Sequence, residues 1–263
     1  MELWKEGTPD WAFKGVKPSA PFVGKDYEPG KGLLLYASAE NLAGYKDIEK
    51  EEYLYDDRAW DRHRLVFEEW SKEIRKANAP FPRVHIQPVS DGGLLVASAF
   101  VCSRLGVKVD PDPVRFIESI AVANIGKFSF NAKTNKDYAG TWKYLKESVD
   151  YVKADLESLK PAIFILPFVS WGLDELRGKL NPLVQGAQLV PVYQCNPTVI
   201  NLKLGPNADV VAEENLKNRY ATEPWFEWIP RLKKGMNKTI WRYLLHVDRM
   251  MDKQGLPRWG NEP

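Results

Sequence analysis

The chain has few of the residues from which proteins build metal and redox centres. Among its 263 residues there are two cysteines, Cys102 and Cys195, and three histidines. The cysteines lie in different segments and form no Cys-x-x-Cys pair, which excludes a zinc or iron–sulfur site held by four cysteines. No two histidines have the spacing of metal ligands. We therefore expect a protein that works without a metal.

Long apolar runs and nucleotide-binding motifs are also absent. No run of about 18 apolar residues occurs, and the first residues lack the basic and apolar regions of a signal peptide, so we expect a soluble, cytoplasmic protein with no membrane partner. No Gly-x-Gly-x-x-Gly motif, P-loop or Gly-x-Ser-x-Gly elbow is present, and we expect no cofactor. The net charge of +2 argues against a broad basic surface for nucleic acid, although it is compatible with a local basic groove.

Four short apolar runs are the main indication of the fold. Each is followed by polar residues or by a helical pattern, and together they cover residues 33–37, 119–123, 162–167 and 189–194. Continuous apolar runs of this length are typical of strands that are buried on both faces of a parallel sheet. With helices between the strands, the alternation predicts the α/β class, as a three-layer α/β/α sandwich around a mostly parallel four-stranded sheet.

Around this α/β core, residues 31–205, we expect two attached segments. Residues 1–30 hold four prolines and four glycines, which predicts an irregular N-terminal arm. Residues 206–263 end in an apolar pattern of helical spacing, which predicts a helical extension packed on the core. Across the chain we expect loops at 107–116 and 222–230, and helices at 58–77, from a cap at Ser90 or Asp91 to Gly106, and at 138–160, 171–180, 206–220 and 235–253.

Polar side chains follow the strands, and the carboxyl ends of parallel strands are where open sheets bind ligands. Ser38, Glu40 and Asn41 lie at the end of the first strand, and Asn124 ends the second. A carboxylate such as Glu40 could orient or deprotonate a water; the alternative is a helix cap or a loop acid. The Asn124 amide offers a donor and an acceptor that could read the edge of a pyrimidine, or it could satisfy neighbouring backbone.

Other polar residues have weaker patterns. Lys127 could meet a phosphate or backbone, or lie on a solvated loop. His85 precedes the second helix and could contact a ligand or be structural, whereas His246 lies on a charged helix and is expected to be exposed or bridging. Asn196, Pro197 and Thr198 follow the last strand, where they present hydrogen-bonding groups on a stiff turn or form an ordinary one.

Taken together, the strand ends resemble the uracil-DNA glycosylase superfamily over about residues 31–205. The family's first motif, such as Gly-Gln-Asp-Pro or Gly-x-Asn-Pro, is matched by Ser-Ala-Glu-Asn at 38–41, and a later family strand ends in Asn, as the strand before Asn124 does. Leu-Lys-Pro-Ala-Ile-Phe-Ile-Leu at 159–166 resembles the family's next strand. Asn-Pro-Thr at 196–198 resembles its His-Pro-Ser or Asn-Pro-Ser motif, in the form of the mismatch-specific branch.

The resemblance implies a site and a substrate. Glu40, with Asn41, would hold or activate the attacking water, and Asn124 would read a base flipped out of DNA. The segment 196–198 would press on the DNA backbone or steady the departing base. The chain departs from the family where Ser38 and Asn41 replace Gly and Pro, and where Glu40 is one methylene longer than Asp.

Three hypotheses follow for the function. The first is hydrolysis of the N-glycosidic bond of a damaged or deaminated base in DNA, without a metal. The second is a non-catalytic nucleic-acid-binding homologue that keeps the fold and has lost the chemistry. The third is a hydrolase of a nucleoside or another small molecule on the same fold.

Overall fold

The computed structural model describes the greater part of the chain: residues 8–18, 20–40, 64, 67–68, 71–72, 92–132, 136–204, 209–232 and 234–256. Expectations for Asn41 and His85, and for most of the helix at 58–77, lie outside the described residues. Within that stretch the described residues are helical, and Phe67 packs against Phe22 with ring centroids 4.6 Å apart.

Five strands form one mixed sheet in the order β1-β3-β2-β4-β5. The pairs β3–β2, β2–β4 and β4–β5 are parallel, and the bounds of these strands are β2 Leu33–Ala39, β3 Ala121–Gly126, β4 Ile163–Pro167 and β5 Gln188–Val192. All four predicted apolar runs therefore form strands. The predicted strand count is wrong because β1 (Phe22–Val23), in the arm expected to be irregular, pairs antiparallel with β3.

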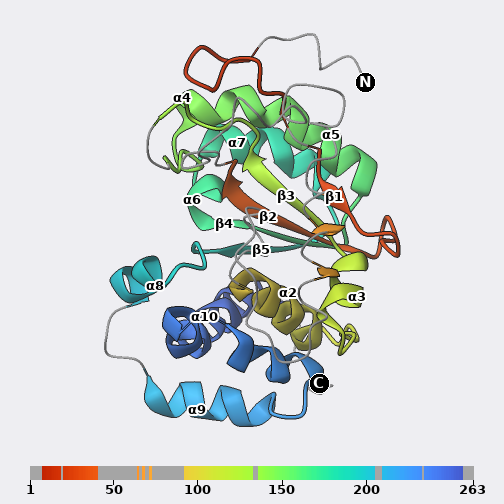
Figure 1. Ribbon diagram of the computed structural model, residues 1–263, viewed down its shortest axis with the longest axis vertical. Helices are drawn as coiled ribbons and strands as arrows, with labels where there is room; N and C mark the ends of the chain where they lie inside the picture. Colours follow the sequence, from red (N-terminus) through yellow and green to blue (C-terminus); the bar gives the residue numbers. More distant parts are fainter. Residues whose placement is uncertain are drawn as a thin grey trace.

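Helices cover both faces of the sheet (Figure 1). One face carries α4 (Trp142–Leu145), α5 (Val149–Leu159) and α7 (Asp174–Leu180), and the other carries α2 (Gly93–Arg104), α3 (Pro113–Glu118) and α10 (Lys234–Lys253). Successive side chains of a strand point to opposite faces. Leu34 and Phe164 thus join the buried cluster of α5, whereas Leu35 and Ile165 join that of α2 and α10. The predicted α/β class is confirmed.

Shorter elements complete the chain. They are α6 (Phe168–Trp171), α8 (Pro197–Leu204), α9 (Val210–Arg219) and the 3-10 helices η5 (Lys146–Ser148), η6 (Asn181–Leu183) and η7 (Pro224–Arg231). In Figure 1, α9 lies beyond α10 as seen from the sheet, whereas α8 lies to the left of α10. No helix among the described residues has the length and apolar character needed to cross a bilayer.

Four local expectations are corrected. The expected loop at 107–116 contains the start of α3, where Pro113 follows Asp112 and the Asp112 side chain accepts the Val114 N–H at 2.9 Å. Helix α2 has its cap at Gly92, in the left-handed region at φ 71°, instead of at Ser90 or Asp91. The expected single helix at 138–160 is α4, η5 and α5, and the expected aromatic loop at 222–230 is largely η7.

Candidate functional site

Two predicted site residues meet at the carboxyl ends of β2 and β3. Asn124 Nδ2 donates a hydrogen bond to Glu40 Oε2 at 2.8 Å. The register places Ala37 beside Asn124 and Ala39 beside Gly126. Beyond β2, the Glu40 N–H donates to the Gly126 carbonyl at 2.8 Å, so the pairing continues by one residue. The parallel pairing of β2 with β3 therefore places the Glu40 carboxylate next to the Asn124 amide.

The amide of Asn124 has one satisfied end and one unsatisfied end. Glu40 is 8% exposed and Asn124 is 2% exposed, so both groups are removed from water. A carboxylate oxygen accepts hydrogen bonds, and here Glu40 Oε2 faces the NH₂ end of the amide. Asn124 Oδ1 is buried and has no hydrogen-bond partner in the described part of the chain. A buried acceptor without a partner costs about 1–3 kcal/mol and is uncommon in native proteins.

Tyr138 lies against Gly126 and close enough to Glu40 to be affected by its charge, and no motif in the sequence indicates this role. Its hydroxyl donates to the Phe128 carbonyl at 2.6 Å and accepts the Phe128 N–H at 3.0 Å. A Cβ on Gly126 would lie 2.7 Å from Tyr138 Cζ, so only glycine allows this approach. Burial raises the pKa of Tyr138 above its ordinary value, and the Glu40 charge adds to this effect. The phenol therefore stays protonated at neutral pH.

Lys127 is corrected from a solvent-facing residue to a buried one. Its side chain is 1% exposed, and Nζ forms an ion pair with the Asp155 carboxylate. The Tyr36 hydroxyl donates to the same Asp155 at 2.8 Å. Burial, followed by the negative charge of Asp155, holds the pKa of Tyr36 well above its ordinary value. The ammonium is therefore part of an internal network, and it is presented neither to a phosphate nor to a solvated loop.

The segment after β5 begins a helix. Asn196 Oδ1 accepts the Thr198 N–H at 2.8 Å, and the Ile200 N–H donates to the Asn196 carbonyl at 2.8 Å. Asn196 is thus the N-cap of α8, with Pro197 in its first position. Asn196 and Thr198 are exposed and Pro197 is half-buried. Strand β4 separates β5 from β2, so this segment follows a strand that does not adjoin β2.

Two further features lie at or near this edge. Ser38 is half-buried on β2, two residues before Glu40. Helix α2 begins close to the end of β5, because a Cβ on Gly93 would lie 2.8 Å from Cys195 Sγ. The first N–H groups of a helix lack intrahelical partners and carry partial positive charge. Among the described residues, no group of three or more His, Cys, Asp or Glu side chains could hold a metal ion.

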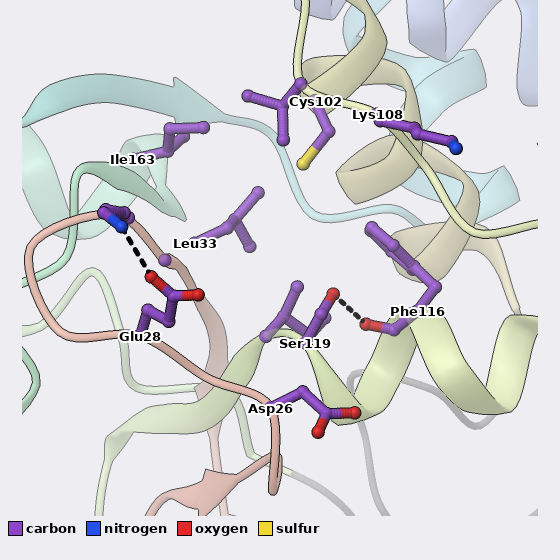
Figure 2. A pocket seen from close by; sticks show the side chains of 12 residues that line it. Asp26, Glu28, Leu33, Cys102, Lys108, Phe116, Ser119 and Ile163 are labelled. Atoms are coloured by element: carbon purple, nitrogen blue, oxygen red, sulfur yellow. Dashed lines mark hydrogen bonds and ion pairs between the residues drawn. The ribbon is translucent and has the colours of Figure 1, made fainter.

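A cavity of about 260 Å³ lies at the opposite, amino ends of β2 and β4 (Figure 2). The apolar side chains that line it are Leu33, Cys102, Val107, Phe116, Ile120 and Ile163. Two polar groups on its wall are already paired, Glu28 with Lys31 at 2.8 Å and Ser119 Oγ with the Phe116 carbonyl at 2.7 Å. Burial raises the pKa of Cys102 to about 12, which keeps the thiol neutral. Asp26 and Lys108 also lie on its wall. None of the described residues that line this cavity has a buried side-chain polar atom without a partner, which makes it a weaker candidate than the Glu40 and Asn124 edge.

No family model, curated protein or solved structure matches this chain. The chemistry of the site must therefore be inferred from its own groups. A buried carboxylate can orient a water or take its proton, and a buried amide oxygen without a partner can accept a hydrogen bond from a ligand N–H or O–H. Both groups occur together at the carboxyl end of the parallel strands, where ligands bind in sheets of this kind.

Proposed function

We propose that this chain is a glycosylase-like protein of the uracil-DNA glycosylase type, which hydrolyses the N-glycosidic bond of a damaged or deaminated base in DNA. The observation that carries the proposal is Asn124 Oδ1, a buried acceptor without a described partner at the carboxyl end of β3. Enzymes that act on a base in DNA read the flipped base by hydrogen bonds to its edge. The parallel order of β3, β2, β4 and β5, with helices on both faces, supports a three-layer α/β/α sandwich for this function.

The proposed reaction needs only groups that the chain supplies and water. Water attacks the sugar C1′ while the C1′–N bond breaks, and the base leaves with the bonding electron pair. Glu40 orients the attacking water or accepts its proton, and the departing base gains a proton in turn. Glu40 Oε2 accepts the hydrogen bond from the Asn124 amide, so the carboxylate is held beside the amide that would read the base.

The test is base release from fluorescent oligonucleotides that carry uracil, hypoxanthine, xanthine or a G·T mismatch, with alkali to cut abasic sites. We expect cleavage of at least one substrate, and a fall of about 100-fold or more in Glu40→Ala and in Asn124→Ala. Glu28→Ala removes an exposed acid at the other end of the sheet and should retain the activity. Full turnover in the Glu40 and Asn124 variants would rule out this mechanism.

A second candidate is a hydrolase or binder of a free nucleoside. It is favoured by Lys127, because the cation expected to contact a phosphate is buried in an ion pair with Asp155. Binding to DNA weakens steeply with salt when phosphates are contacted, whereas binding of a neutral nucleoside does not. Nucleoside affinity that is unchanged between low and high salt, with no measurable affinity for oligonucleotides, would favour this candidate.

A further inference from the structure

We propose that a cavity between α9 and α10 binds free phosphate: basic side chains of α10 hold the charge of the ion, and a carboxylate of α9 accepts its proton. The cavity has a volume of about 160 Å³, and its polar lining consists of Asp209, Glu213, Arg242, His246 and Arg249. Neither Glu40 nor Asn124 lines it, so this inference is independent of the proposed function.

Four basic residues lie on one face of α10. Arg242, His246, Arg249 and Lys253 follow one another at intervals of four, three and four residues, and residues at such intervals share a face of an α-helix. The first three line the cavity. Burial lowers the pKa of His246 to about 4, and the charges that add to this effect are those of Lys253 and Arg249. The charges that act on the imidazole are therefore positive, although two carboxylates line the same cavity.

Two acids of α9 face these basic side chains. Asp209 Oδ2 lies 2.9 Å from Arg249 Nη2, and the two side chains are 51% and 55% exposed. Glu213 Oε1 lies 3.5 Å from Arg242 Nε, and these side chains are only 21% and 19% exposed. An exposed ion pair stabilises a protein little. Arg249 can therefore exchange Asp209 for an incoming anion at little cost, whereas Glu213 stays inside the cavity.

Glu213 Oε1 and His246 Nε2 are buried and make no hydrogen bond within the described part of the chain. Buried polar atoms without a hydrogen bond are uncommon in native proteins. The His246 ring is held by its stack on Tyr193, with an angle of 17° between the rings. Glu213 Oε1 accepts hydrogen bonds only, and the neutral imidazole can donate or accept at Nε2. A carboxylate acceptor beside cationic donors is complementary to an anion that carries a proton.

Phosphate is an anion of this kind. At neutral pH it is negatively charged and keeps at least one O–H, which can donate to Glu213 Oε1, while arginine binds its other oxygens by charge-assisted hydrogen bonds. Sulfate has the same shape without the proton, so one of its oxygens would face Glu213 lone pair to lone pair. Leaving a buried acceptor unsatisfied corresponds to a loss of about 10- to 100-fold in affinity.

The size of the cavity favours the free ion over a phosphate ester. Pockets for drug-sized ligands have volumes of about 300–1,000 Å³, whereas this one has about 160 Å³. A bulky group attached to the phosphate would have to remain outside, where it gains no contact with the lining. The same chemistry in a monoester is therefore expected to bind more weakly than in the free ion.

The experiment titrates phosphate, sulfate and phenyl phosphate into the full chain at pH 7 and constant ionic strength. Binding is followed by NMR through the Cε1–H resonance of His246, which is identified by its absence in His246→Phe. We expect phosphate to bind at least about tenfold more tightly than sulfate or phenyl phosphate. Saturating phosphate should also raise the pKa of His246 by one unit or more from about 4, because a bound anion favours the imidazolium.

Glu213→Gln tests the carboxylate that accepts the proton. The new amide has an NH₂ group that can donate to a sulfate oxygen. We expect the ratio of phosphate to sulfate affinity to fall by about tenfold, whereas a purely structural role would weaken both ions equally. Glu214→Gln, the same substitution on an exposed acid of α9, should leave the ratio unchanged.

Arg249→Gln tests the cation that exchanges its partner. It should weaken phosphate and sulfate alike by about tenfold, and Arg219→Gln, on an exposed arginine at the end of α9, should weaken neither.

Three results would overturn the inference. In the wild-type protein these are a His246 resonance that does not move at millimolar phosphate, or phosphate bound no more tightly than sulfate or phenyl phosphate. Neither requires a variant to fold. The third is an unchanged phosphate affinity in Arg249→Gln with a wild-type melting temperature. Base release from oligonucleotides is measured separately, so failure of the phosphate site leaves the proposed function standing.

Discussion

At the scale of single residues, two buried polar side chains have different surroundings: Asn124 near the end of β3, and Lys127 directly after it. Lys127 is neutralised by Asp155, which also accepts from the Tyr36 hydroxyl. Such a network fixes the sheet against α5 and is complete within the chain. Asn124 has a bond to Glu40 on one side and an unpaired oxygen on the other. Internal pairing accounts for the first group, whereas the proposed function assigns the unpaired oxygen of the second to a ligand.

Asn124→Asp tests the contact between Asn124 and Glu40. The new carboxylate would face Glu40 at hydrogen-bonding distance, and like charges raise the pKa of one member of such a pair. A carboxyl whose folded pKa is raised stabilises the fold at low pH and loses that contribution as the pH rises. We expect a loss of roughly 3 kcal/mol in unfolding free energy at pH 8 and a smaller loss at pH 4, measured by urea unfolding.

The matched control for this charge is Asn131→Asp, on an exposed residue. It adds the same negative charge without a buried neighbour, so its unfolding free energy should differ little from wild type at both pH values. An Asn124→Asp protein with wild-type stability at pH 8 would contradict the buried contact with Glu40.

His246, which the sequence analysis expects to be exposed or bridging, is a pH-sensitive residue. It is partly buried and stacks on Tyr193 with ring centroids 4.7 Å apart. Burial lowers the pKa of His246 to about 4, and the positive charges of Lys253 and Arg249 contribute. Its Nε2 has no hydrogen-bond partner among the described residues. The charged residues that line the adjoining cavity are Asp209, Glu213, Arg242 and Arg249.

The lowered pKa of His246 predicts that the fold loses stability in acid. The unfolded imidazole takes up a proton near its ordinary pKa of 6.5, whereas the folded one does so only near 4, so stability is lost as the pH falls between these values. His246→Phe keeps the stack on Tyr193 and removes the proton. We expect its melting temperature relative to wild type to rise as the pH falls from 7.5 to about 4.5, by differential scanning calorimetry. A constant difference would contradict the lowered pKa.

At the scale of elements, the sequence predicted the strands that consist of continuous apolar runs. The four parallel strands were recognised because each is buried on both faces and so carries an uninterrupted apolar run. Strand β1 was missed because it has two residues inside a segment rich in proline and glycine. Helix α3 is not predicted because Pro111 and Pro113 are typical of a loop, although Asp112 followed by Pro113 is a good start for a helix.

The pairing of Glu40 with Asn124 was partly predictable, because the apolar runs show where the parallel strands end. Polar residues at the ends of adjacent parallel strands come together, which is how Glu40 and Asn124 were selected. The strand order could not be read from the sequence, and without it the position of Asn196 relative to Glu40 was unknown. The partner of Lys127 is Asp155, 28 residues away on α5, and only the packed fold brings the two together.

A buried ion cluster joins α2 to the end of α10. Arg104 is fully buried and bonds Asp248 Oδ1 at 2.8 Å, Asp252 Oδ1 at 2.6 Å and the Leu256 carbonyl at 3.1 Å. We expect Arg104→Leu to lower the unfolding free energy by about 3–5 kcal/mol, because Asp248 loses a buried counter-ion. Urea unfolding measures this, with Arg115→Leu, on an exposed residue of α3, as the control.

A double variant separates lost charge balance from lost packing. Arg104→Leu combined with Asp248→Leu removes both charges of the pair, so it should be less destabilised than Arg104→Leu alone. If the double variant is as unstable as the sum of the two single variants, the two side chains do not interact as the distance of 2.8 Å indicates.

At the scale of the whole molecule, the C-terminal segment belongs to the main core. Side chains of α10 and of the sheet share one buried cluster, which contains Val190 and Val192 of β5. The hydrophobic α10 members with no exposed surface are Ile240, Tyr243, Leu244, Val247 and Met251. The Tyr243 hydroxyl also donates to the Tyr193 carbonyl at 2.7 Å, just beyond β5. One face of the sheet is therefore covered by a helix that the sequence suggested as an extension.

Because α10 and the sheet share one buried cluster, we predict that residues 1–205 do not fold without the rest of the chain. Exposing a large apolar side chain costs about 1.5–3 kcal/mol, so uncovering the five fully buried α10 side chains alone would cost about 7.5–15 kcal/mol. That is comparable to the whole stability of a typical domain, about 5–15 kcal/mol. The truncated protein should lack near-ultraviolet circular dichroism and a cooperative thermal transition, both of which the full chain should show. A sharp transition in residues 1–205 would mean that the sheet is stable without α10, and would limit the role of α10 to covering it.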